Sequence, residues 1–268
     1  MPPHSTMKTA ALVDVQSSPD DRDIAIDRVG VRNVRYPMHV RNKDNGLQHT
    51  VGTFTLTVDL PKHYKGTHMS RFLEVLSQHN HDLGPETIPG ILKRLRERLD
   101  ADSAHLEVRF TFFREKAAPV TGGKGMMGYE CGFSATGGAV NDFELLLTVP
   151  VTTLCPCSKE IASRGAHNQR GYVSVRVRPT ALLWLEDVID LIEACGSAPL
   201  YPLLKRPDEK FVTEQAYDNP RFVEDLVREV SAAFDNDPRV ASYEIEVENH
   251  ESIHDHNAYA RLARAKAR

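Results

Sequence analysis

Apolar and polar residues alternate with a period of two in the first part of this 268-residue chain. Phe54, Leu56 and Val58 are separated by threonines, and this alternation predicts a strand that buries one face. A preceding strand is expected over 29–40. Pro37 interrupts it, and because proline cannot donate to a ladder, we expect this strand to be broken or to lie at a sheet edge.

Helical spacing of apolar positions follows over 68–78 and again from Thr87 to about 99, which predicts two amphipathic helices. Period two returns with Leu106, Val108 and Phe110, and another strand is expected near 127–133 after a glycine-rich turn. The first half therefore predicts the order strand, strand, helix, helix, strand, strand.

The second half repeats this order. We expect strands at 143–151 and 173–178, a helix over 185–192, and a later helix with Asn219 as N-cap and Pro220 at its first position. A strand over 243–248 and a final amphipathic segment, which runs to Arg268, complete the series.

The fold class predicted by these patterns is α+β, with two tandem ββααββ units that form an antiparallel sheet with helices on one side. The units span approximately 27–136 and 139–268 of one domain, 27–268. Residues 1–26 are polar without periodicity and are expected to form a disordered tail. The unpaired edges of such a sheet favour closure by self-association, so an oligomer is expected.

Composition narrows the classes of function. The 33 basic and 37 acidic residues give a net charge of −4, which argues against an extended nucleic-acid-binding face. No apolar run approaches the ~20 residues needed to cross a bilayer, and the N-terminus lacks the apolar stretch of a secretory signal. We therefore expect a cytoplasmic protein with neither a membrane nor a nucleic-acid partner.

The cysteines Cys131, Cys155, Cys157 and Cys195 are too few for a disulfide scaffold and favour metal binding or chemistry. Cys155 and His167 lie in one loop and could supply two ligands to zinc or a similar divalent metal. Their spacing fits no zinc finger, whereas a catalytic site needs only one Cys, one His and one carboxylate. The alternative is that the cysteines are buried at a strand end and that His167 is an ordinary loop histidine.

Further candidates lie in four other segments. His254 and His256 follow a strand and could transfer protons or bind a metal; the alternative is a polar loop at a helix start. Asp208, Glu209 or Glu214 could complete a metal site, and composition does not choose among them; a solvated acidic loop is the commoner explanation.

Glu224 falls outside the buried stripe of its helix, which predicts exposure unless a ligand or another subunit covers it. The helix start with Lys65, His68, Ser70 and Arg71 could bind an anion, or could simply be capped.

Several stretches together resemble the GTP cyclohydrolase I family of type IB, and the match spans about residues 26–262. These stretches, in chain order, are Lys65-Gly66-Thr67-His68-Met69-Ser70-Arg71-Phe72, Cys155-Pro156-Cys157-Ser158-Lys159-Glu160, Gly165-Ala166-His167-Asn168-Gln169-Arg170, Asn219-Pro220-Arg221-Phe222-Val223-Glu224-Asp225 and Glu251-Ser252-Ile253-His254-Asp255-His256-Asn257-Ala258.

The resemblance implies the tunnelling fold, in which ββααββ units assemble into oligomeric barrels with active sites between subunits, here a homotetramer. It implies conversion of GTP and water to 7,8-dihydroneopterin triphosphate and formate, the first step of tetrahydrofolate biosynthesis. It also implies one divalent metal per active site, Zn, Mn or Fe.

Residue roles follow from the same resemblance. The implied metal ligands are Cys155, His167 and Glu209, with Cys155, His254 and His256 at the reacting ring and Glu224 as the anchor of the guanine edge. The residues expected to bind the rest of the substrate are Lys65, His68, Ser70, Arg71, Lys159 and Arg170. Glu214 is a candidate beside the metal ligands. Cys157 could also lie beside them, could be an alternative ligand or could be a redox-sensitive spectator, and the sequence does not choose among these roles.

Two other functions are alternatives to the GTP cyclohydrolase. One is an NADPH-dependent 7-deazaguanine nitrile reductase of the same fold, in which Cys155 or Cys157 would attack the substrate and no metal would be needed. The other is a module without catalytic activity that binds a metal or a nucleotide.

Overall fold

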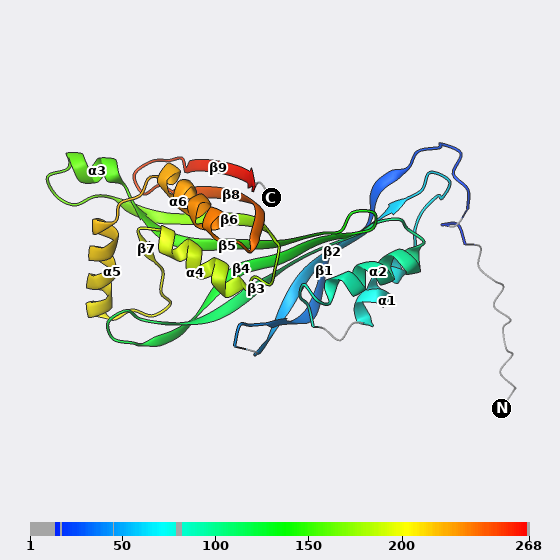
Figure 1. Cartoon of the computed structure of the whole chain (residues 1–268), viewed down its shortest axis with the longest axis horizontal. Helices are drawn as coiled ribbons and strands as arrows, with labels where there is room; N and C mark the ends of the chain where they lie inside the picture. Colours follow the sequence, from blue (N-terminus) through cyan, green and yellow to red (C-terminus); the bar gives the residue numbers. More distant parts are fainter. Residues whose placement is uncertain (1–13, 17, 45, 79–81, 267–268) are drawn as a thin grey trace, which may run out of the picture.

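The computed structural model describes residues 14–16, 18–44, 46–78 and 82–266 (Figure 1). Residues 1–13 of the predicted tail lie outside this described part. The rest of the predicted tail contacts the segment before the first helix, because the amide of Lys65 donates to the carbonyl of Ser18 over 3.1 Å. Residues 14–16 and 18–25 are therefore held in part against the domain.

The first half follows the predicted order. Its elements are β1 (Ile26–Arg41), β2 (Leu47–Leu60), α1 (Met69–Ser77), α2 (Ile88–Leu99), β3 (Ala104–Ala117) and β4 (Lys124–Gly137). β1 carries Pro37 and forms an edge of the sheet, as the proline predicts. Its two register shifts against β2 lie before Val34, and the pairing around Pro37 is regular.

The second half has the same order of strand pairs around helices, with additional elements. They are β5 (Asp142–Leu154), α3 (Pro156–Ile161), β6 (Asn168–Pro179), α4 (Leu185–Cys195), β7 (Ala198–Pro199), α5 (Arg206–Asp218), α6 (Val223–Asn236), β8 (Val240–His250) and β9 (Ala258–Ala265). The final amphipathic segment is thus a strand that pairs with β8.

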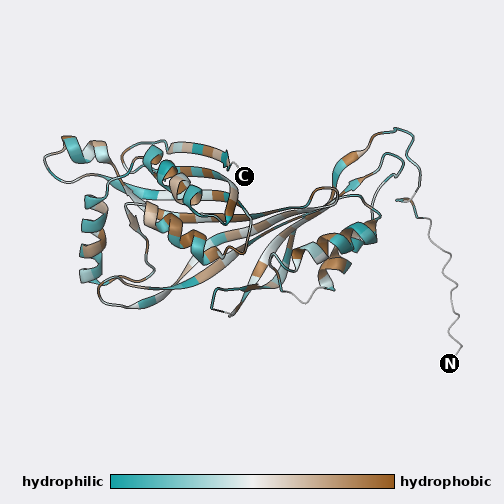
Figure 2. Cartoon of the chain, viewed as in Figure 1, coloured by the Kyte–Doolittle hydropathy of each residue, from teal (hydrophilic) through white to brown (hydrophobic). Residues whose placement is uncertain are grey.

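All named strands belong to one nine-stranded antiparallel sheet with the order β1-β2-β3-β4-β5-β6-β8-β9, and β7 pairs with β5. Figure 1 shows α1 and α2 beside one half of this sheet and α4 and α6 beside the other, while α3 and α5 lie beyond one end of the strands. Hydrophobic and hydrophilic residues both occur along α2 and α6 (Figure 2), and their apolar side chains are buried in the core. The fold class is α+β, as predicted.

Two local predictions were wrong. The acidic stretch around Glu209 is helical, because Pro207 occupies the first turn of α5 and Asp208 caps it. Asn219 ends α5 and does not begin α6; its side-chain amide donates to the carbonyl of Gly196 over 2.9 Å. α6 begins at Val223, where Asp225 accepts a hydrogen bond from the amide of Phe222.

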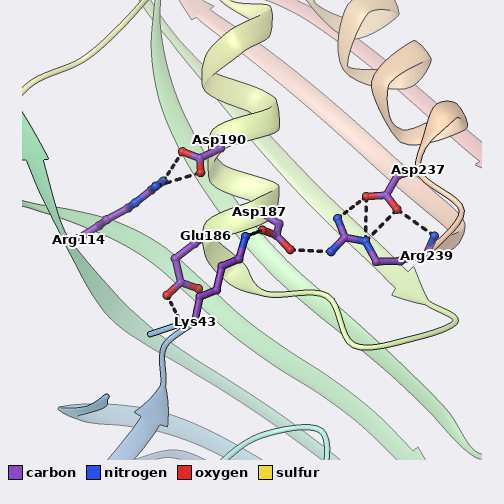
Figure 3. Close-up of polar contacts among 7 residues, drawn as sticks. All are labelled: Lys43, Arg114, Glu186, Asp187, Asp190, Asp237 and Arg239. Atoms are coloured by element: carbon purple, nitrogen blue, oxygen red, sulfur yellow. Dashed lines mark hydrogen bonds and ion pairs between the residues drawn. The ribbon is translucent and has the colours of Figure 1, made fainter. Parts of the chain in front are cut away.

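Ion pairs connect the two halves along α4 (Figure 3). Asp187 of α4 accepts from Lys43 of the β1–β2 turn over 2.5 Å and from Arg239, before β8, over 2.6 Å. Asp190, one turn further along, pairs with Arg114 of β3. These contacts fix α4 against elements from both halves of the chain.

No helix in the described part of the chain is both long and apolar enough to cross a membrane.

Candidate functional site

Cys155 and His167 lie side by side because they flank two paired strands. Leu154 at the end of β5 pairs with Asn168 at the start of β6, so the next residue and the preceding residue leave the sheet at the same point. The amide of Cys155 donates to the carbonyl of His167 over 3.1 Å. Both side chains are partly buried.

Ser158 connects these two residues further. Its hydroxyl donates to the carbonyl of Cys155 over 3.2 Å and accepts from the amide of His167 over 3.2 Å. Its own amide donates to the thiol sulfur of Cys155 over 3.4 Å, which makes Cys155 the N-cap of α3. Cys157 is exposed on α3. The sequence reasoning gave Ser158 no role.

The imidazole of His167 faces two further polar side chains. Its Nδ1 lies 3.0 Å from Oε1 of Gln169 and 3.8 Å from Oε2 of Glu251. The side chains of His167 and Glu251 are only 13% and 12% exposed, so this contact is largely shielded from water. Gln169 and Glu251 were also missed, although Glu251 stands three positions before His254.

His254 and His256 lie between β8 and β9. Their rings stack with centroids 5.1 Å apart and planes inclined by 19°. Both are exposed, and Nδ1 of His256 lies 3.3 Å from a carboxylate oxygen of Asp255. Two imidazoles at this spacing can exchange protons with a ligand at the surface.

The three acidic candidates on α5 have different surroundings. Glu209 is exposed in the first turn, and Glu214 is exposed with a carboxylate oxygen 3.7 Å from the ammonium of Lys210. Asp208 is fully buried and accepts four hydrogen bonds, from the amides of Val120, Thr121 and Lys205 and from the hydroxyl of Thr121. Both carboxylate oxygens of Asp208 are therefore already hydrogen-bonded within the protein.

Burial alone would raise the pKa of Asp208, but the hydrogen bonds from Thr121, Lys205 and Val120 more than offset this effect. They hold its pKa well below the ordinary value of 3.8. The carboxylate thereby attaches the first turn of α5 to the β3–β4 turn.

In the part of the chain that the structure describes, no three His, Cys, Asp or Glu residues gather closely enough to hold a metal ion. Cys155 and His167, adjacent through their backbones, carry a thiol and an imidazole, the residue types that zinc and similar metals prefer as ligands. The third implied ligand, Glu209, is not gathered with them. One chain thus brings two of the three implied ligands together.

Three other candidates of the second half, Glu224, Lys159 and Arg170, lie on segments that adjoin β5, α5 or β6. Glu224 is exposed in the first turn of α6, and the loop before it is attached to β5 because the amide of Arg221 donates to the carbonyl of Leu154 over 3.0 Å. The ammonium of Lys159 donates to the carbonyl of Tyr217 and lies 4.4 Å from the centre of its ring. Arg170 is exposed on β6 beside a hollow of about 390 Å³, which is also lined by Thr152, Asn168, Gln169, Tyr172 and Leu200.

The predicted anion site lies elsewhere. Lys65, His68, Ser70 and Arg71 surround the start of α1, and Figure 1 shows α1 at the opposite end of the molecule from α3 and α5. Nε2 of His68 lies 3.2 Å from a carboxylate oxygen of Asp14, and the guanidinium of Arg71 contacts the carbonyl of Arg98 at 3.4 Å. A single chain does not bring this group to Cys155.

Solved structures with a similar fold are urate oxidases. The chain aligns with uricase from Arthrobacter globiformis at a TM-score of 0.54 and 8% identity, covering 90% of this chain and 93% of that one. Urate oxidase from Bacillus subtilis gives a TM-score of 0.52, with 91% of this chain and 99% of the other covered. This likeness shows the tunnelling fold.

Comparison of sequences identifies the family. Residues 12–260 match the family model described as type I GTP cyclohydrolase folE2. The chain is 52% identical to GTP cyclohydrolase FolE2 of Kosmotoga olearia over 254 residues, which cover 95% of this chain and 99% of that protein. It is 51% identical to the Methylococcus capsulatus protein of the same name, with 96% of each chain covered. The chain belongs to the type I GTP cyclohydrolase FolE2 family.

Proposed function

We infer that this protein is a GTP cyclohydrolase I that converts GTP and water to 7,8-dihydroneopterin triphosphate and formate, the first step of tetrahydrofolate biosynthesis. Family membership over nearly the whole chain is the main support. The observation that carries the assignment to a site is the adjacent pair Cys155 and His167, fixed by a direct backbone hydrogen bond and by Ser158.

The site is proposed to use one divalent metal, Zn, Mn or Fe. Cys155 and His167 would hold it, with Glu209 of α5 as the third ligand that the family resemblance implies. When bound, the metal supplies Lewis-acid activation of the water that attacks C8 of the guanine ring. Cys157 and Glu214 are proposed to lie beside these ligands without binding the metal directly.

The protein's own side chains account for proton transfer and base selection. His254 and His256 are proposed to protonate N7 and then N9 as the five-membered ring opens, since an imidazole titrates near neutral pH. Glu224 would accept hydrogen bonds from N1–H and the 2-amino group of guanine. Adenine lacks this pair of donors, so it would leave the carboxylate without partners.

The complete site is proposed to form between subunits of a homotetramer. The cationic group at the start of α1 lies at the opposite end of the chain from Cys155, so Lys65 and Arg71 could reach the triphosphate only from another copy. Exposed apolar side chains on α3, on α5, before α6 and in the β8–β9 loop support coverage by a partner. They include Ile161, Phe211, Phe222 and Ile253. Lys159 and Arg170 would contact the triphosphate from the first subunit.

The test is incubation of the purified protein with GTP, followed by detection of the fluorescent pterin with and without a chelator. Activity that is lost with the chelator and restored by added Zn or Mn would support the metal-dependent cyclohydrolase and exclude the nitrile reductase. Cys155→Ala and His167→Ala should retain near-normal thermal melts yet form no pterin. If both variants unfold instead, the metal is structural and the catalytic proposal is wrong.

A further inference from the structure

Three neighbouring strands change from apolar to polar at the same end of the sheet and on the same face. On β5 the buried Val151 is followed two residues later by the buried Thr153. On β8 the buried Val247 is followed by the buried Asn249, and on β6, between them, the buried face ends at Gln169. Elsewhere the side chains on this face of the sheet belong to the apolar core. The change from apolar to polar residues therefore marks a polar interior next to the Cys155–His167 pair.

Gly171 makes room for this polar interior. A side chain at this position of β6 would place its Cβ only 2.6 Å from the amide oxygen of Asn249, a distance that real Cβ atoms do not show. The strand therefore carries no side chain between Val173 and Gln169 on the buried face.

Gln169 is 9% exposed, and burial of an amide is costly unless both of its ends are hydrogen-bonded. Both ends have partners. Oε1 lies 3.0 Å from Nδ1 of His167, and Nε2 donates to Oε1 of Glu251 over 3.5 Å. The amide thus lies between a histidine on one side and a carboxylate on the other.

The carboxylate decides which way the amide points. An ionised Glu251 can only accept hydrogen bonds, so the NH₂ group of Gln169 must face it and the carbonyl oxygen must face His167. A carbonyl oxygen also only accepts, so Nδ1 of His167 must carry the proton. In the neutral imidazole that binds metals, the lone pair is then on Nε2, which has no hydrogen-bond partner among the residues that the structure describes.

We propose that Gln169 is a positioning residue: with Glu251 behind it, it fixes the tautomer and the ring orientation of His167 so that Nε2 is available to bind the metal. This inference rests on the proposed metal-dependent function. Groups that hold the second nitrogen of a metal-binding histidine typically contribute 10- to 100-fold to metal affinity.

The experiment titrates the metal-free protein with Co²⁺, whose absorption reports thiolate and imidazole ligation, and measures affinity by competition with a chelator. Gln169→Leu should bind Co²⁺ about 10- to 100-fold more weakly than the wild type. Gln169→Glu combined with Glu251→Gln exchanges acid and amide and keeps an acceptor toward Nδ1, so its affinity should stay within a few-fold of the wild type.

Gln48→Leu is the matched control. Gln48 also uses both ends of its amide on a strand, with the backbone of Phe113, but in the first half of the chain. Its replacement should leave Co²⁺ affinity unchanged. Unchanged affinity in Gln169→Leu, or an exchanged double variant as weak as Gln169→Leu, would overturn the proposal.

Nitrogen-15 NMR of the metal-free wild type provides a test that does not depend on a variant's stability. The signals of His167, assigned by their loss in His167→Gln, should show the proton on Nδ1; a proton on Nε2 would overturn the proposal. A wild-type protein that binds Co²⁺ without a thiolate band would instead contradict the proposed metal site, while the NMR result would still decide the role of Gln169.

Discussion

The amide of Cys155 donates to the carbonyl of His167, and the hydroxyl of Ser158 bridges the same two residues. Ser158→Ala removes this bridge. Because each hydrogen bond contributes roughly 1 kcal/mol net, we expect the free energy of unfolding to fall by about 1–2 kcal/mol. We also expect weaker metal binding. Denaturant melts and Co²⁺ titration would measure the two effects.

Ser163→Ala serves as the control for Ser158, since Ser163 is exposed in the loop after α3. Ser163→Ala should change neither the free energy of unfolding nor the affinity for Co²⁺. Equal metal affinity in Ser158→Ala and the wild type would show that the backbone contact alone is sufficient to hold the pair.

Glu224→Gln tests base recognition. The substituted amide can present only one acceptor to guanine N1–H and the 2-amino group, so one donor of the bound base would lose its partner and we expect kcat/KM for GTP to fall by about 100-fold or more. Steady-state assays of pterin formation would measure this loss. Glu97→Gln, an exposed change on α2, should leave the kinetics unaltered. Unaltered kinetics in Glu224→Gln would remove the guanine anchor from the proposal.

Asp208→Asn should loosen the attachment of α5 to the β3–β4 turn, because an NH₂ group would then face backbone donors. We expect a clearly lower Tm, together with weaker metal binding through the adjacent Glu209. Asp218→Asn, at the exposed end of α5, is the control and should melt like the wild type.

The same substitution predicts a pH dependence. The folded-state pKa of Asp208 lies below 3.8, so its carboxylate contributes stability above that pH and the contribution is lost as the pH falls through the folded-state pKa. The Tm difference between wild type and Asp208→Asn should therefore be constant near neutral pH and shrink in acid. A difference that grows below pH 3.8 would contradict this assignment.

The ion pairs on α4 predict unequal effects for two partners. Lys43 is 56% exposed, so Lys43→Ala should cost less than about 1 kcal/mol. Asp187 is 13% exposed and contacts both Lys43 and Arg239, so Asp187→Ala should cost about 1–3 kcal/mol. Urea melts of both single variants and of the double variant would measure these changes in the free energy of unfolding. An equal loss of unfolding free energy in Lys43→Ala and Asp187→Ala would show that the contact between Arg239 and Asp187 does not stabilise the protein.

Local patterns predicted most of the fold. Alternation around Leu56 and helical spacing around Ile91 identify β2 and α2, because each element buries one face and its period is visible in the sequence. The same reasoning failed for α5, which buries only Asp208 and Ala216 and so shows no apolar stripe. Asn219 was misassigned because its partner, Gly196, is distant in the sequence.

The candidate site was predictable only in part. Cys155 and His167 have side chains of metal-binding types in one loop, so residue type and position in the chain were enough to single them out, and the structure places their backbones in contact. Gln169 carries no such chemistry, and its contact with Glu251 depends on the pairing of β6 with β8, which no local pattern reveals.

The separation of α1 from α3 has a consequence for genetics. If one site needs Arg71 from one copy and Cys155 from another, neither Arg71→Ala nor Cys155→Ala protein alone can complete it. Mixed oligomers assembled from both defective chains would contain some intact sites, so co-expression would restore part of the activity that each allele lacks. Conversely, an excess of either defective chain over the wild type would inactivate sites to which a wild-type chain contributes its residues, because the other half of each such site would come from a defective chain.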